Sequence, residues 1–140
     1  TCSDHRFRQQ VTEFLAHLGF HAPHSICIPG GVVISNPLLS SFNLLPKAIQ
    51  HFIGRVVEMK QVPTVVCIAH ENCGAYRPGK HQLVNAAMHS LSGRSVTDVH
   101  HDHLRKAARR IRDTMHRTEV RAFFAEVREG GKVTFTEIAL

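Results

Sequence analysis

The stretch Thr64-Val65-Val66-Cys67-Ile68-Ala69-His70-Glu71-Asn72-Cys73 decides the fold of this chain. Its first six residues form an almost uninterrupted apolar run, which is typical of a strand that is covered on both faces. Strands of this kind belong to parallel sheets that have helices on both sides. The run leads directly into His70 and Cys73, so a histidine and a cysteine follow the carboxyl end of the predicted strand.

Helical and extended patterns alternate along the rest of the chain. The apolar spacing predicts helices over 7–18, 46–59 and, with Thr97 or Asp98 as the cap, 97–117, and a shorter helix over 83–91. Apolar runs separated by glycine predict a buried strand over 25–28 and a hairpin formed by 120–127 and 132–138. The sequence therefore predicts a single α/β domain over 1–140, with a mainly parallel central sheet flanked by helices and an antiparallel edge strand at the carboxyl end.

The composition limits the classes of function. The longest clean apolar run, 65–69, is far shorter than the roughly 18 residues of a membrane-spanning helix, and no signal segment opens the chain, so we expect a soluble, cytoplasmic protein. The net charge is +6, and basic residues crowd 105–121. A solvated helix face explains such a stripe more often than nucleic acid does, and one tyrosine with no tryptophan offers few stacking platforms. Nucleic acid is disfavoured as a partner, and no membrane partner is expected.

A second motif, Cys2-Ser3-Asp4-His5-Arg6, begins the chain. With His70 and Cys73 it supplies two thiols and an imidazole, the ligands of a zinc site that keeps a fourth position open. We expect the other two cysteines, Cys27 and Cys67, in the core, because both lie in apolar, β-branched stretches. If a strand extends through this motif, Cys2, Asp4 and Arg6 share one side and His5 takes the other. Asp4 then either pairs with Arg6 or caps the helix that follows, and the sequence leaves both open.

These motifs resemble those of the β-class carbonic anhydrases, which carry Cys-x-Asp-Ser-Arg after one strand and His-x-x-Cys-Gly after another. The resemblance implies that Cys2, His70 and Cys73 bind Zn²⁺ and that Asp4 and Arg6 form a catalytic dyad beside the metal. It implies hydration of carbon dioxide to bicarbonate by a metal-bound hydroxide, in a homodimer or higher homo-oligomer. It also implies a closed state in which Asp4 itself takes the fourth metal position.

The chain departs from the pattern of this family at two places. His5 stands where the family has serine, and Ile28-Pro29-Gly30-Gly31-Val32 stands where the family usually has Arg-Asn-Ala-Gly-Asn. Because this loop differs from the family pattern, the resemblance does not identify the substrate. Hydrolysis of a CO2-like molecule, carbonyl sulfide or carbon disulfide, is one alternative, and a non-catalytic zinc-containing binding domain is another.

Two further histidines, His100 and His103, fall on one face of the predicted long helix. They could belong to a second metal site, but exposed polar residues at a helix start are a more frequent explanation. We therefore expect them to be exposed, without a role in the site.

Overall fold

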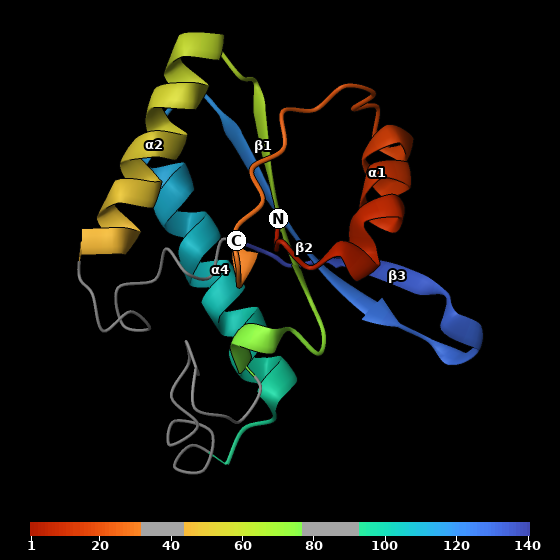
Figure 1. Ribbon diagram of the computed structural model, residues 1–140. Helices are drawn as coiled ribbons and strands as arrows, with labels where there is room; N and C mark the ends of the chain where they lie inside the picture. Colours follow the sequence, from red (N-terminus) through yellow and green to blue (C-terminus); the bar gives the residue numbers. More distant parts are fainter. Residues whose placement is uncertain (32–43, 77–92) are drawn as a thin grey trace.

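The computed structural model describes residues 1–31, 44–76 and 93–140 (Figure 1). The helices are α1 (Arg8–His17), α2 (Leu44–Lys60) and α4 (Val96–Thr114), and the strands are β1 (Thr64–His70), β2 (Glu119–Val127) and β3 (Val133–Glu137). Short 3-10 helices are η1 (His5–Phe7), η3 (Gly74–Tyr76) and η4 (Glu129–Gly131). The helix predicted over 83–91 and residue Val32 of the altered loop lie outside the described residues.

The three strands form one mixed sheet in the order β1-β2-β3. β1 and β2 are parallel, in a register that runs from Thr64 opposite Glu119 to His70 opposite Ala125. β2 and β3 are antiparallel and form the predicted hairpin, whose turn places Gly130 at φ 76°. The general α/β class is confirmed, whereas the described sheet has one parallel and one antiparallel pair and does not confirm a mainly parallel centre.

The strand predicted over 25–28 is wrong in its extent. Ile28 forms only an isolated parallel bridge with Cys2, and no longer strand surrounds it in the described residues. Cys27 is exposed, so its predicted place in the core is also wrong. The reason is the alternation of an extended segment: Ile26 packs against the core, which turns the next side chain outward.

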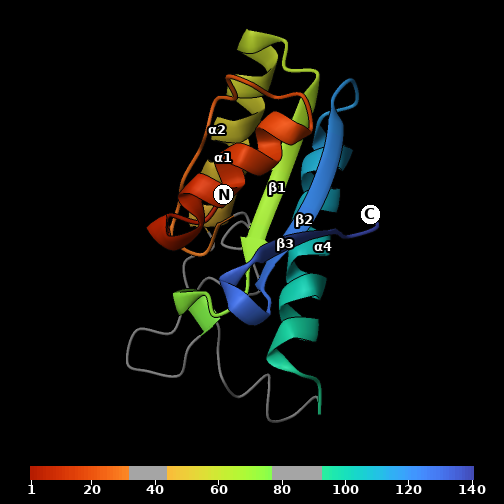
Figure 2. The ribbon, with the colours of Figure 1, turned by 90° about the vertical axis from the view of Figure 1, so that its right-hand side faces the viewer.

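Helices cover both faces of the sheet, with α1 on one side of the strands and α2 and α4 on the other (Figures 1 and 2). Cys67 and Ala69 of β1 belong to the core under α2 and α4, while Ile68 packs with Leu15 of α1. Successive side chains of β1 thus enter opposite cores, which explains the uninterrupted apolar run of this strand. The predicted core position of Cys67, which is 3% exposed, is confirmed.

The N-cap of the long helix α4 lies two residues before Thr97, the first of the two expected caps. Ser95 is the N-cap, and its side chain and that of Asp98 accept hydrogen bonds from each other's backbone N–H groups, which forms a capping box. The helix ends at Thr114 instead of about residue 117. In the described part of the chain, no helix has the length and apolar character that would carry it across a membrane.

Candidate metal centre

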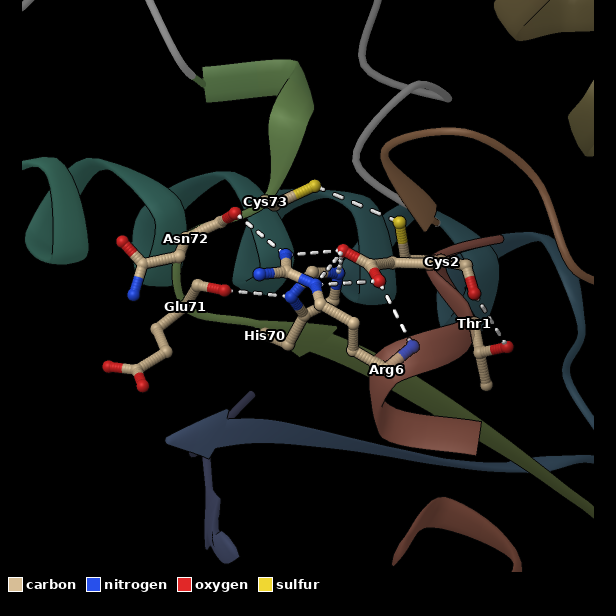
Figure 3. Close-up of polar contacts among 8 residues, drawn as sticks. Thr1, Cys2, Arg6, His70, Glu71, Asn72 and Cys73 are labelled. Atoms are coloured by element: carbon tan, nitrogen blue, oxygen red, sulfur yellow. Dashed lines mark hydrogen bonds and ion pairs between the residues drawn. The ribbon is translucent and has the colours of Figure 1, made fainter. Parts of the chain in front are cut away.

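Three side chains from two distant segments converge at the carboxyl end of β1 (Figure 3). Cys2 is held beside Ile28 by the parallel bridge, His70 is the last residue of β1, and Cys73 follows in the turn. One ligand atom from each of Cys2, His70 and Cys73 lies within 4.8 Å of the others. The three predicted ligands therefore form a group that could hold a metal ion.

His70 presents one particular nitrogen to this group. Its Nδ1 lies 2.8 Å from the Glu71 carbonyl oxygen. Because a carbonyl oxygen only accepts, Nδ1 carries the hydrogen and Nε2 keeps its lone pair. Nε2 is buried and has no hydrogen-bond partner in the described residues, and the Phe7 ring packs 4.6 Å from the imidazole. An oriented imidazole with a buried, unused lone pair is suited to binding a metal.

The two thiols of the group have different pKa values. Their sulfur atoms are 3.8 Å apart, and both cysteines are free of disulfides. A hydrogen bond from Cys73 lowers the pKa of Cys2, and the same interaction raises the pKa of Cys73. Burial alone would lower the pKa of His70, but its interactions with Cys2 and the Glu71 carbonyl raise it. The pocket thus favours a negative thiolate that would attract a cation.

Cys67, by contrast, has no place in this group. It is fully enclosed by apolar side chains, and its burial raises the pKa of the thiol to about 12. The side chain therefore stays protonated at neutral pH and behaves as a small core hydrophobe.

Asp4 and Arg6 form a bidentate ion pair beside the group. The Arg6 Nε donates to Asp4 Oδ1 at 2.9 Å, and the Arg6 Nη2 donates to Asp4 Oδ2. The guanidinium holds the pKa of the Asp4 carboxyl well below its usual range. Asp4 Oδ2 lies 4.0 Å from His70 Nε2, so an ionised carboxylate faces the metal group.

Both roles left open for Asp4 occur together. Besides pairing with the Arg6 side chain, Asp4 accepts the backbone N–H of Arg6 at 3.1 Å and so caps η1. A strand therefore does not extend through the whole motif, because the backbone turns into η1 at His5. His5 itself is exposed.

A contact between the two motifs was missed by the sequence analysis. Arg6 Nη2 also donates to the backbone carbonyl oxygen of Asn72 at 3.2 Å. Asn72 has a φ of 52°, a left-handed conformation that asparagine tolerates better than most residues. The sequence did contain a signal for this turn, because Asn72 stands between His70 and Cys73 and asparagine favours a left-handed conformation.

The glycine loop packs directly against the first motif. Gly30 and Gly31 both have positive φ, and a Cβ at Gly31 would lie 3.1 Å from the Cys2 nitrogen and 3.4 Å from the Ile68 oxygen. A side chain at this position would push Cys2 away from β1. The loop therefore keeps the first thiol within reach of the other two ligands.

His100 and His103 are buried, so their expected exposure is wrong. They are 2% and 4% exposed. Tyr76 packs on both: its hydroxyl is 3.0 Å from His103 Nδ1, and its ring lies 3.8 Å from that of His100. Burial lowers the pKa of His100 to about 3. The first turns of α4 face the core instead of solvent, because the turn after β1 carries Tyr76 onto them.

Acidic side chains partly neutralise the basic stripe over 105–121. Asp102 pairs with Lys106 at 2.8 Å and also lies within 4.0 Å of Arg94 and Arg105. Arg121 lies on β2 and forms a bidentate pair with Glu137. These pairs reduce the positive charge that is free to meet another molecule.

Comparisons of the chain with protein-family models, with curated proteins and with solved structures found no match.

Proposed function

We propose that this chain is a zinc-dependent carbonic anhydrase of the β type, which hydrates carbon dioxide to bicarbonate and acts as a homodimer or higher homo-oligomer. The observation that carries the proposal is the convergence of Cys2, His70 and Cys73 next to the ionised Asp4–Arg6 pair. Three ligands and an adjacent carboxylate are the parts that such a reaction requires.

The dimensions of the group fit zinc. Tetrahedral coordination with Zn–S bonds of about 2.3 Å places two sulfur ligands about 3.8 Å apart. The sulfur atoms of Cys2 and Cys73 are separated by 3.8 Å. The ligand types agree as well, because thiolate and imidazole are ligands that zinc prefers, and the lone pair of His70 Nε2 has no other use among the described residues.

Zinc held by three protein ligands lowers the pKa of water to about 7 and so supplies hydroxide at neutral pH. Asp4, whose ionised carboxylate faces the metal group, would accept a hydrogen bond from the nucleophilic water and so hold its orientation. Arg6 would keep Asp4 ionised and fix its orientation through two parallel hydrogen bonds. Glu71 would hold the tautomer of His70 through its carbonyl oxygen.

Asp4 is better suited to stand beside the metal than to bind it in this arrangement. Its carboxylate is not part of the group whose atoms lie within 4.8 Å of one another. That separation supports a fourth position that is open to water, as hydration requires.

A stopped-flow assay of carbon dioxide hydration, on protein with its zinc content measured, tests the proposal. We expect a rate above buffer for the zinc-loaded chain and a large loss of rate for Asp4→Asn with the zinc retained. Glu137→Gln removes the carboxylate of the remote Arg121–Glu137 pair and is the matched control, with activity kept. A zinc-loaded wild-type chain without hydration would refute the proposal, and release of hydrogen sulfide from carbonyl sulfide in its place would change the substrate.

A further inference from the structure

The parallel ladder between β1 and β2 continues for one residue beyond the end of β1. Glu71 N–H donates to the Ala125 oxygen at 2.9 Å. In a regular parallel ladder, a residue that donates in this way also accepts, through its own C=O, the N–H two residues further along the partner strand. The regular partner of the Glu71 carbonyl oxygen would therefore be the N–H of Val127.

The Val127 N–H does point toward this residue. Along β2, the next residue, Arg128, donates its N–H to the Lys132 oxygen on the β3 side of the strand. Because successive N–H groups of a strand point to opposite edges, the N–H of Val127 points to the β1 side. The acceptor that it finds there is the side-chain carboxylate of Glu71, whose Oε1 lies 2.6 Å away.

The carbonyl oxygen of Glu71 has a different partner. It lies 2.8 Å from Nδ1 of His70 and accepts the hydrogen of that nitrogen. Figure 3 shows this carbonyl directed at the imidazole, while the carboxylate of the same residue extends away from the two cysteines. A side-chain oxygen of Glu71 thus takes the place in the sheet that its own backbone oxygen would otherwise occupy.

This exchange lets one residue serve the sheet and the histidine at once. A carbonyl that bonded Val127 would point at β2 and turn away from His70. The carboxylate supplies β2 with a charge-assisted hydrogen bond, which is stronger than a bond between neutral groups. The nearest other carboxylate on β2 does not compete for this place, because Glu126 pairs with Arg128 at 2.8 Å.

The same turn is held at a second point. Arg6 Nη2 donates to the Asn72 carbonyl oxygen, so the backbone between His70 and Cys73 is tied to the first motif as well as to β2. Histidines that bind metals usually donate their second ring N–H to such an oxygen, and the loss of this partner weakens metal binding 10- to 100-fold. The orientation of the Glu71 carbonyl therefore bears directly on the metal group.

We propose that Glu71 is a positioning residue of the metal centre: its carboxylate replaces its own carbonyl oxygen in the sheet, and the freed carbonyl keeps the hydrogen of His70 on Nδ1 and Nε2 toward the metal. A side chain without an oxygen acceptor would let this carbonyl return to Val127 and would release the imidazole. The inference rests on the metal centre of the proposed function but not on the molecule that is hydrated.

The first test measures zinc affinity by competition with a chelator. Glu71→Ala removes the acceptor, whereas Glu71→Gln keeps an oxygen at the same reach. We expect the dissociation constant of zinc to rise about tenfold or more in Glu71→Ala and to stay within about threefold of wild type in Glu71→Gln. Glu126→Ala removes the neighbouring carboxylate and is the matched control, with wild-type affinity. Val127 is 45% exposed, so the changes lie at the surface end of the sheet and spare the core.

The second test needs no metal and is not affected by a general loss of stability. The NMR shifts of the ring nitrogens of His70, measured in metal-free, reduced protein, report which nitrogen carries the hydrogen in the neutral ring. Wild type and Glu71→Gln should show the Nδ1–H form, and Glu71→Ala should show a mixture of both forms.

Equal zinc affinities in wild type and Glu71→Ala, or an unchanged Nδ1–H form in Glu71→Ala, would overturn the proposal. An equal loss of affinity in Glu126→Ala would also overturn it, because the effect would then belong to the hairpin and not to the Glu71 carboxylate. A wild-type chain that binds zinc and shows these differences, but does not hydrate carbon dioxide, would refute the proposed function and support the role of Glu71.

Discussion

Two groups of buried polar side chains meet around Tyr76, and they differ in what surrounds them. In the metal group, His70 Nε2 faces two thiols and an ionised carboxylate. In the aromatic group, formed by Tyr76, His100 and His103, the imidazole of His100 packs against the rings of Tyr76 and Phe124. The pKa of His70 is raised and that of His100 is lowered, although both are buried.

The comparison shows that burial alone does not make a histidine a ligand. Negative neighbours raise the pKa of His70 and would attract a metal ion to its Nε2, whereas the apolar and aromatic surroundings of His100 lower its pKa and attract no cation. Within the described ranges, the metal group is the one set of three ligand atoms close enough to hold an ion. The predictions below test this division, from the largest expected effect to the smallest.

Cys73→Ser should produce the largest change. Replacing the thiolate with a hydroxyl removes one of three ligands, so the zinc affinity should fall by more than about 100-fold, which is beyond the usual effect of an outer-shell partner. Cys67→Ser should keep stoichiometric zinc and lose only stability, because its side chain lies in the apolar core. Zinc titration and thermal unfolding measure both effects, with Cys27→Ser as the exposed control. Full zinc affinity in Cys73→Ser would contradict the ligand assignment.

Arg6→Ala should reduce activity while the metal stays bound. Asp4 would lose both guanidinium hydrogen bonds, so we expect kcat/KM for carbon dioxide hydration to fall about 10- to 100-fold. Arg121→Ala removes a bidentate arginine–carboxylate pair of the same kind from the sheet and serves as the matched control. Equal activities of the two variants would show that the Asp4–Arg6 pair has only a structural effect.

The dependence of the unfolding free energy on acidic pH should reveal the contribution of His100 in the aromatic group. The folded-state pKa of His100 lies at about 3, well below its ordinary value near 6.5, so the unfolded chain binds more protons between these values. The stabilising contribution is therefore complete above pH 6.5 and is lost as the pH falls, by at most about 1.4 kcal/mol per pH unit. His100→Phe should flatten the dependence of the unfolding free energy on pH between 4.5 and 6.5.

The matched control for this measurement is His116→Phe, which changes an exposed histidine. It should keep the wild-type slope in urea unfolding curves recorded across the same pH range. Identical slopes for wild type and His100→Phe would mean that folding does not lower the pKa of His100, which would contradict the contrast between the two groups.

The smallest effect is expected from the left-handed residue in the ligand turn. Asn72→Val should cost about 1–2 kcal/mol of unfolding free energy, because a β-branched side chain is strained at its φ of 52°. It should also weaken zinc binding a few-fold, whereas Asn72→Gly should preserve it. Gln61→Val introduces the same strain at a φ of 49° outside the site and should leave zinc affinity unchanged. A loss of zinc affinity at both positions would indicate a general effect of instability.

Local pattern was enough to find α1, α2, α4, β1 and the hairpin, because each depends on its own apolar spacing and glycines. The convergence of Cys2, His70 and Cys73 was also predictable, because both motifs were expected at the carboxyl ends of neighbouring strands. The exposure of Cys27 and the burial of His100 were not predictable, because each depends on which neighbouring segment the residue packs against. Tyr76 covers the start of α4 only after the turn at Asn72 has been made, and no local pattern encodes that contact.

Tyr76 also gives the protein an optical property of its own. The chain contains one tyrosine, no tryptophan and eight weakly emitting phenylalanines, so its tyrosine emission comes from a single side chain. That side chain packs in one cluster with Cys73 and Cys2, while its hydroxyl contacts His103. We therefore expect a change at the metal group to alter the tyrosine emission, so that metal binding could be followed without an added dye or label.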